Sequence, residues 1–275
     1  MQRIDAHQHF WKYHPVKEAW ITDDMKVIQK DFLPEDLKPI LLQNGIDGCV
    51  AVQADQSDEE TRYLLELAQK HDFIKGVVGW VDLNAPTLEQ KLESYKTETR
   101  LKGFRHILQP EADGFMSTPS FIKGVQLLGQ MGFCYDLIIG HRQLPEALRL
   151  VSKVTETPLV LDHIAKPDIK NGTLEPWKEY MTQLAAFPNV QVKLSGMVTE
   201  ANWQKWTYQD MKIYIDIILE LFGAERVMFG SDWPVCLLAS SYQRWVEVLE
   251  RATDHLNHTE KQAIFGGNAA SFYGL

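Results

Sequence analysis

The sequence predicts a single closed barrel of eight parallel strands and eight helices, the (β/α)8 or TIM-barrel class of α/β fold, formed by residues 1–275. Its 275 residues match the roughly 250 that one such barrel needs. Short apolar, β-branched runs alternate with segments of helical periodicity along the whole chain. No linker rich in Pro, Gly or Ser interrupts this alternation, so one domain is the economical interpretation.

Eight runs are predicted to be strands, because each is short, rich in apolar residues and bounded by polar or turn residues. In chain order they are 3–6, 46–53, 75–82, 101–108, 132–139, 158–163, 190–195 and 226–230. Strict alternation of strands with helices calls for parallel strands joined by right-handed crossovers. A doubly wound open sheet is the alternative, but no GxGxxG turn follows the first strand, and polar residues follow nearly every strand rather than one switch point.

Helix-start signals occur between the strands. Residues 57–60 and 87–90 have the Ser/Thr and Glu/Gln spacing of a capping box. Residues 118–119 place a threonine before a proline at the first helical position, and 33–34 form a similar entry without the polar cap. Residues 267–273 are predicted to form a short helix that closes the outer ring of the barrel.

Composition and charge exclude several classes of protein. The net charge of -9 provides no basic face, so no nucleic-acid partner is expected. Cys49, Cys134 and Cys236 have neither disulfide-framework nor CxxC spacing, which favours a reducing cytoplasm. Residues 1–10 leave no room for a signal peptide, and no apolar run approaches the roughly 18 residues of a membrane span. The expectation is a soluble cytoplasmic enzyme with no membrane partner, and a homo-oligomer is left open.

Two histidines stand at the end of the first strand. His7 and His9 are two residues apart, so both side chains point to the same face of an extended strand. Imidazole is the commonest zinc ligand, and this pair could supply half of a metal site. A structural, hydrogen-bonded pair is the equal alternative from these two residues alone.

Polar residues at the ends of other strands favour the functional alternative. His163 closes the sixth strand, Asp232 follows the eighth, and Arg105 lies on the fourth. Barrel enzymes gather catalytic residues at this face. Asp232 is the predicted general base that deprotonates a water, and Arg105 and His163 are the predicted donors that stabilise an oxyanion. Since no GxSxG elbow is present, activated water is preferred to a covalent intermediate.

Further strand-end residues are candidates for contacts with substrate. Lys193, Gln53 and His106 could donate to or accept from a small polar substrate. Trp11 and Trp80 could form a flat apolar wall for a ring, although ordinary packing is the commoner role of tryptophan. Three strand-end residues have two equal interpretations. They could touch substrate, or they could serve as hydrogen-bonding partners of the residues that do. These residues are His106, Asp136 and Ser195.

At these residues the sequence resembles the amidohydrolase superfamily, in particular its amidohydrolase-related branch, which includes lactonases for sugar acids and for pyrone dicarboxylates. The matching stretches are IDAHQHFW at 4–11, FLPEDLKPIL at 32–41, GFRHILQ at 103–109, YDLII at 135–139, LVLDHIAKP at 159–167, VKLSGM at 192–197, RVMFGSDWPV at 226–235 and GNAASFYGL at 267–275. They span nearly the whole chain. Within the branch, the pattern is most similar to the L-fuconolactonase and L-rhamnonolactonase group.

The resemblance implies a distorted TIM barrel in which His7, His9, His163 and Asp232 occupy metal-binding or substrate-polarising positions. The best-known binuclear members carry a bridging lysine or glutamate on the fourth strand and a histidine on the fifth, whereas this chain has Arg105-His106 and Asp136. That departure disfavours a binuclear centre. One divalent metal, such as zinc, and a metal-independent site remain the two alternatives.

The resulting prediction is a hydrolase that opens a small sugar-acid lactone. Related barrels decarboxylate aromatic or unsaturated acids with a metal at the same positions, and others hydrolyse pyrone dicarboxylates, so these two activities are the alternatives. A non-catalytic binding barrel would leave the buried polar cluster unexplained, because stability alone favours apolar residues at desolvated positions.

Overall fold

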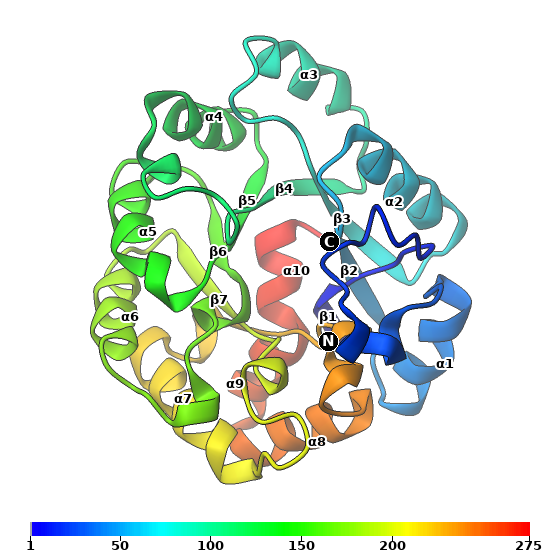
Figure 1. The fold of residues 1–275 in the computed structure, drawn as a ribbon, viewed down its shortest axis with the longest axis vertical. Coiled ribbons are helices and arrows are strands. Elements are labelled where there is room, and N and C mark those ends of the chain that lie inside the picture. The colour runs from blue at the N-terminus through cyan, green and yellow to red at the C-terminus, as the bar shows by residue number, and fades with distance from the viewer. Residues whose placement is uncertain (1) are drawn as a thin grey trace.

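The computed structural model describes residues 2–275, which form one barrel (Figure 1). Its eight parallel strands are hydrogen-bonded in the order β1 to β8. They are β1 (Ile4–Gln8), β2 (Gly48–Val52), β3 (Ile74–Gly79), β4 (Leu101–Ile107), β5 (Cys134–Ile138), β6 (Leu159–Leu161), β7 (Val190–Leu194) and β8 (Val227–Phe229). All eight predicted strands are confirmed, with ends that differ by a few residues.

Most of the helices lie outside the ring of strands (Figure 1). They are α1 (Pro34–Gln43), α2 (Asp58–Lys70), α3 (Leu88–Tyr95), α4 (Pro119–Gln130), α5 (Leu144–Val151), α6 (Trp177–Ala185), α7 (Tyr208–Phe222), α8 (Tyr242–Ala252), α9 (His258–Gln262) and α10 (Asn268–Tyr273). The prolines at 34 and 119 begin helices as predicted. Ser57 accepts a hydrogen bond from the Glu60 amide, but Thr87 makes no side-chain cap, so the second predicted capping box is wrong.

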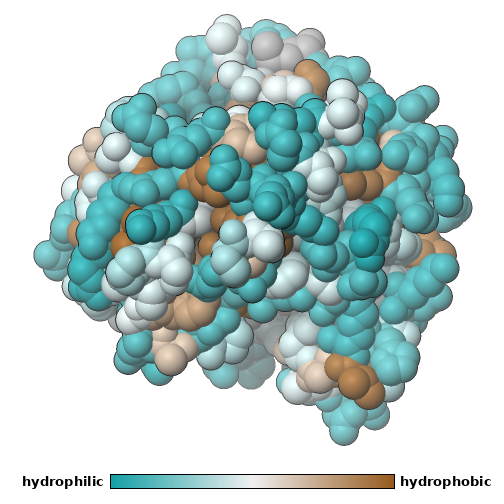
Figure 2. Space-filling model, turned by 90° about the horizontal axis from the view of Figure 1, so that it is seen from above, coloured by the Kyte–Doolittle hydropathy of each residue, from teal (hydrophilic) through white to brown (hydrophobic). Residues whose placement is uncertain are grey.

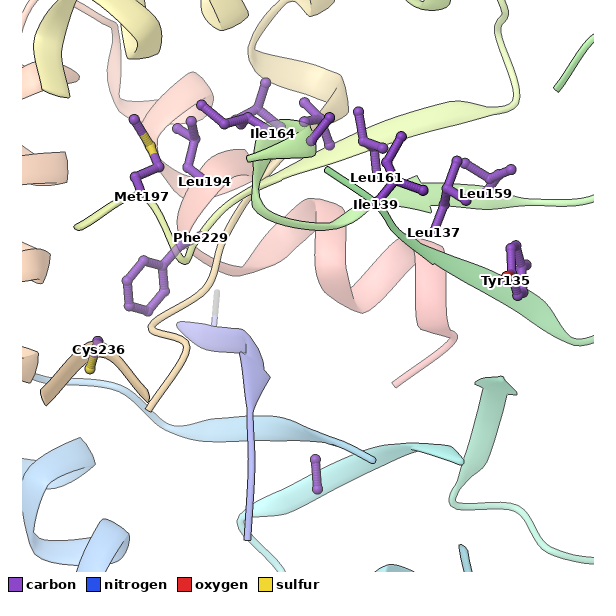
Figure 3. Packing of buried hydrophobic residues seen from close by; sticks show 14 of the residues in the cluster. Tyr135, Leu137, Ile139, Leu159, Leu161, Ile164, Leu194, Met197, Phe229 and Cys236 are labelled. Carbon is purple, nitrogen blue, oxygen red and sulfur yellow. The ribbon is translucent and has the colours of Figure 1, made fainter. Parts of the chain in front are cut away.

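Two apolar clusters lie on the two sides of the strands. The outer cluster fills the space between strands and helices, and Leu137, Leu159 and Leu161 of β5 and β6 belong to it (Figure 3). The inner cluster fills the lower part of the barrel, with Val50, Val160 and other inward-facing residues. Burying each such side chain contributes about 1.5–3 kcal/mol. Because the outer and inner clusters cover both faces of each strand, the sequence of each strand is a nearly continuous apolar run.

Helix α10 corrects one prediction. It does not close the outer ring: Ala269 and Tyr273 belong to the inner cluster, and the helix lies within the ring of strands (Figure 1). Small alanines leave room for close approach, and Tyr273 fills the barrel from the side opposite the strands' carboxyl ends. The apolar side chains of a segment do not tell which side of the strands it covers.

The barrel closes where its first and last strands meet. Gln8 and Trp233 form a parallel bridge, the His9 amide donates to the Trp233 carbonyl at 2.7 Å, and the Asp232 amide donates to the His7 carbonyl at 2.8 Å. Beneath this seam, Asp5 accepts hydrogen bonds from the backbone amides of His7 and Ser231. The β1–β8 seam therefore consists of the backbone of predicted site residues.

Figure 2 shows one face, which is mostly hydrophilic with small, separated hydrophobic spots. Within residues 2–275, no helix combines the length and apolar character required to cross a membrane.

Candidate active site

An irregularity in β1 aims both of its histidines into the barrel. Asp5 pairs with Cys49, but Gln8 pairs with Ala51, so three residue steps on β1 match two on β2. This β-bulge reverses the alternation of side chains, a device that is common next to active sites. Ala6 therefore points into the inner cluster, while Gln8 points outward and donates to the Cys49 sulfur. His7 can then face inward beside His9.

Four of the predicted residues converge at the carboxyl ends of the strands. The Nε2 atoms of His7 and His9 are 3.2 Å apart. The Asp232 Oδ1 atom lies 3.4 Å from His9 Nε2 and 3.8 Å from both His7 Nε2 and His163 Nε2. All four side chains are at most 6% exposed. The structure thus brings together the predicted metal-binding set.

His7 and His9 each have a protein partner at the ring nitrogen that faces away from Asp232. His9 Nδ1 lies 2.7 Å from the Val52 carbonyl oxygen, and His7 Nδ1 lies 3.2 Å from Asp162 Oδ1. A carbonyl only accepts, so His9 Nδ1 carries the proton and Nε2 presents its lone pair to the site. Such partners orient metal-ligating histidines in proteins.

The charge states of these groups suit a site for cations and for proton transfer. Burial lowers the pKa of His7 and His163 well below its usual value, so both rings are neutral. Although burial alone would raise it, the neighbouring His163 and His9 hold the pKa of Asp232 below its usual value. Asp232 is therefore an ionised carboxylate at neutral pH.

The donor set fits one divalent metal. Ligands about 2.0–2.1 Å from a tetrahedral zinc lie about 3.3–3.4 Å from one another, which is close to the observed separations among His7, His9 and Asp232. These three residues form a group whose ligand atoms could hold an ion. Arg105 Nη1 also lies 3.3 Å from His7 Nε2, so a cationic donor is available at the same place.

His163 is carried by an unusual backbone turn after β6. Residues 163–166 all have φ between +48° and +60°, a left-handed conformation that is strained for a β-branched residue such as Ile164. The Trp177 indole donates to the Ile164 carbonyl at 2.7 Å, and Ile164 is packed within the outer cluster (Figure 3). These contacts hold the turn and aim His163 at Asp232.

Gly196 provides the space for His163. It has a φ of +59°, and a Cβ atom there would lie 2.4 Å from His163 Nδ1. Gly196→Ala is expected to displace the imidazole and lower kcat about 10–100-fold, as loss of an orienting contact does, measured by steady-state kinetics on a hydrolysed lactone. Gly132→Ala is the matched control, since its φ is +84° and no atom lies within 4 Å of the added Cβ. Equal activity of the two variants would contradict the role of this contact.

Arg105 is fixed by polar neighbours and keeps one free donor. Its Nη1 donates to Asp162 Oδ2 at 3.1 Å, and its Nη2 donates to the Gln53 carbonyl. Gln53 in turn donates to the Arg105 carbonyl at 3.0 Å. Within residues 2–275, Arg105 Nε has no hydrogen-bond partner. Gln53 thus supports Arg105, and Arg105 retains an N–H for a further acceptor.

Lys193 lies below the converging histidines. It is fully buried, with its Nζ 2.5 Å from Asp136, 2.9 Å from Asp162 and 3.2 Å from His7 Nδ1. Although burial alone would lower it, the two carboxylates raise the pKa of Lys193. The structure therefore places Lys193 among other protein charges, and contact with a substrate stays a prediction.

The aromatic candidates lie around this centre. Trp11 is 1% exposed and its indole donates to the Lys30 carbonyl at 2.9 Å, so most of its surface is used in packing. His106 lies on Phe115 with its Nε2 2.8 Å from Glu111. Trp80 is half-buried and, within residues 2–275, its Nε1 has no partner. Their contacts with substrate also stay predictions.

Sequence reasoning missed the importance of Asp162 and Tyr273. Asp162 is fully buried and lies within 3.2 Å of His7, Arg105 and Lys193. The sequence position of Asp162 could have indicated this role. Asp162 comes two residues after the inward-facing Val160, and side chains two residues apart lie on the same face of a strand. Tyr273, whose hydroxyl donates to Asp136, gave no such signal, because it approaches from a helix distant in the sequence.

Comparisons with known proteins agree with this geometry. The family model described as "Amidohydrolase" matches residues 4–275. The chain is 41% identical to an L-fucono-1,5-lactonase of Burkholderia multivorans, over 99% of this chain and 96% of the relative. It is 36% identical to an L-fucono-1,5-lactonase of Burkholderia ambifaria, over the same shares.

A solved structure gives the same fold. The crystal structure of an amidohydrolase from Burkholderia multivorans, with bound zinc, superposes with a TM-score of 0.97 at 40% identity and covers 100% of both chains. The match of the family model over nearly the whole chain and the full-length relatives establish the assignment. The chain belongs to the amidohydrolase family.

Proposed function

We propose that this chain opens the ring of a sugar-acid lactone, of the L-fuconolactone or L-rhamnonolactone type, with water activated by Asp232. The observation that carries the proposal is the convergence of an ionised carboxylate and three histidines, two of them neutral, beside Arg105. The lactonase relatives at 41% and 36% identity support the substrate class.

Asp232 is the group that can accept a proton. Its carboxylate is ionised and faces the His9 and His163 rings. A water held at this carboxylate would lose a proton to it as the water oxygen adds to the lactone carbonyl carbon. The ring C–O bond then breaks, and the alkoxide formed takes up a proton to give the hydroxy acid.

Arg105 is placed to stabilise the developing oxyanion. Its guanidinium is 5% exposed and is held by Gln53 and Asp162, so its direction is fixed before the reaction. The Nε atom without a protein partner supplies a donor for the carbonyl oxygen. Preorganised donors of this kind are usually the largest single contribution to catalysis of acyl transfer.

A divalent metal would be held by His7, His9 and Asp232, with His163 beside them. Such an ion lowers the pKa of a bound water and polarises a carbonyl oxygen. In its absence, the histidines and Arg105 would be the groups that polarise the carbonyl.

The charges at the site favour a neutral substrate. A pyrone dicarboxylate needs additional bidentate arginines for its carboxylates. Arg105 already uses two of its nitrogens on Asp162 and Gln53. Arg142, which follows β5 in the chain, is exposed. A sugar lactone needs one or two donors at its carbonyl and hydrogen-bonding partners for its hydroxyls.

A comparison of specificity constants tests the substrate class. We expect kcat/KM for L-fuconolactone, L-rhamnonolactone or L-galactonolactone to exceed that for 2-pyrone-4,6-dicarboxylate by at least about tenfold, measured with a pH indicator. The opposite ranking by tenfold would overturn the sugar-lactone assignment and leave a lactonase. Release of CO2 instead of ring opening would indicate decarboxylation.

A further inference from the structure

Lys166 and Glu200 form an ion pair between two loops at the carboxyl ends of the strands. Lys166 ends the left-handed turn after β6, with a φ of +48°, and Glu200 ends the short turn Val198–Glu200 after β7. The Lys166 Nζ atom donates to Glu200 Oε1 at 2.9 Å, and the two side chains are 20% and 26% exposed. We call these two residues the rim pair, because a molecule in solution can reach both of them.

The loop that carries Lys166 also carries a residue of the candidate site. His163 lies three residues before Lys166, and its Nδ1 atom is 2.8 Å from Ser195 Oγ. Burial lowers the pKa of His163, and the nearby Lys166 ammonium lowers it further. Burial alone would raise the pKa of Asp232, but neighbouring histidines and, to a smaller extent, the Lys166 ammonium hold it down. The rim pair therefore lies near the reacting groups, on the side that solvent reaches.

The backbone of Lys166 is fixed by a third loop. His141, which follows β5, donates from Nδ1 to the Lys166 carbonyl at 2.8 Å. The Lys166 amide donates to the His163 carbonyl at 2.8 Å. The loops after β5, β6 and β7 thus meet at Lys166, and its ammonium is directed before a substrate arrives, as the polar groups of a preformed ligand site are.

Both groups of the rim pair have capacity for further hydrogen bonds. An ammonium has three donors, and a carboxylate has about four acceptor positions. Within residues 2–275, the Lys166 ammonium and the Glu200 carboxylate each make one hydrogen bond, the one that joins them. A hydroxyl group both donates and accepts, so it can accept from Lys166 and donate to Glu200. The rim pair is neutral as a whole, which suits an uncharged ligand that carries several hydroxyls.

We propose that the rim pair binds the hydroxyl groups of the lactone and so selects sugar lactones over lactones without hydroxyls. Lys166 donates to one ring hydroxyl, and Glu200 accepts from the same hydroxyl or from its neighbour. This inference rests on the function proposed above, in which the lactone carbonyl lies between Asp232 and Arg105 and the rest of the ring extends toward solvent.

Two variants remove the charged groups and keep side chains of similar length. They are Lys166→Met and Glu200→Met. Loss of a hydrogen bond between a charged group and a hydroxyl weakens binding about 10- to 100-fold. We expect kcat/KM for L-fuconolactone to fall by that factor, mainly through a higher KM. For δ-valerolactone, which has no hydroxyl, kcat/KM should change by no more than about twofold.

Lys261→Met is the matched control. Lys261 pairs with Asp254 at 2.8 Å and is 32% exposed. It lines a cavity together with Arg3, which precedes β1, so it lies at the amino ends of the strands, away from the candidate site. This variant should leave kcat/KM for both lactones within about twofold. Partly exposed ion pairs contribute little to stability, so thermal denaturation should find all three variants folded.

Binding of L-fucose gives a readout without hydrolysis. L-fucose has ring hydroxyls like those of L-fuconolactone but no lactone carbonyl, so it cannot be hydrolysed. Calorimetric titration should give dissociation constants at least about tenfold larger for Lys166→Met and Glu200→Met than for the wild-type protein or Lys261→Met. Glu200→Met provides a second route if Lys166→Met does not fold.

Equal losses of activity on L-fuconolactone and δ-valerolactone would overturn the inference, because the rim pair would then act only through the position of His163. Unchanged L-fucose affinity in the folded rim variants, or no binding of L-fucose by the wild-type protein, would overturn it as well. If the wild-type protein hydrolyses no lactone but binds L-fucose through Lys166 and Glu200, the proposed function is wrong and the hydroxyl-binding role stands.

Discussion

Asp232→Asn is expected to lower kcat by about two to four orders of magnitude, the range of general acid–base contributions. The amide has nearly the shape of the carboxylate but cannot accept the proton of the attacking water. Asp232 has a φ of +56°, which asparagine adopts as readily as aspartate does. The backbone bond from residue 232 to the His7 carbonyl is therefore retained, and the loss reports chemistry rather than folding.

Thermal denaturation and steady-state kinetics of the same preparations check this result. Asp254→Asn makes the same chemical change at an exposed carboxylate that pairs with Lys261, and it should leave kcat unchanged. If Asp232→Asn retained more than about a tenth of wild-type turnover on the true substrate, Asp232 would not be the general base.

The double replacement His7→Asn, His9→Asn should abolish bound zinc. Each change removes an Nε2 lone pair that faces Asp232, and the shorter asparagine amide does not reach that position. Metal affinity depends on these neutral ligands, so elemental analysis should find no zinc in the variant. Chelation of the wild-type protein should reduce activity in proportion to the metal removed.

His255 and His258 are both exposed. The double variant His255→Asn, His258→Asn is the matched control, because it removes two imidazoles from the surface and not from the site. That control should keep its metal and its activity. Full activity of wild-type protein in a metal-free preparation would contradict a metal requirement and support direct polarisation of the carbonyl by the histidines and Arg105.

The alternation of strands and helices was predictable because a barrel buries both faces of each strand and leaves long apolar runs in the sequence. Local irregularities were not. The bulge in β1 depends on how the segment between Asp5 and Gln8 pairs with β2. The left-handed turn at 163–166 contradicts the backbone preference of the β-branched Ile164. Tertiary contacts such as the Trp177 indole on the Ile164 carbonyl determine that turn.

The converging residues of the site were predictable because polar groups that end apolar strands meet at one edge of the barrel. Their supporting charges were harder to predict, since the pairing of Lys193 with Asp136 and Asp162 depends on the register of β5, β6 and β7. Tyr273 reaches the same network from a terminal helix, and its apolar neighbours in the sequence gave no sign of which side of the strands it covers.

The seam between β1 and β8 links activity to local opening of the barrel. The amides of His9 and Asp232 that join the two strands belong to residues whose side chains form the site. A fluctuation that separates the strand ends would move His7 and His9 away from Asp232 while most of the barrel stays folded. Heat is therefore expected to inactivate the protein at a lower temperature than it unfolds the whole barrel, because the site residues lie at the seam where few backbone hydrogen bonds join β1 to the segment after β8.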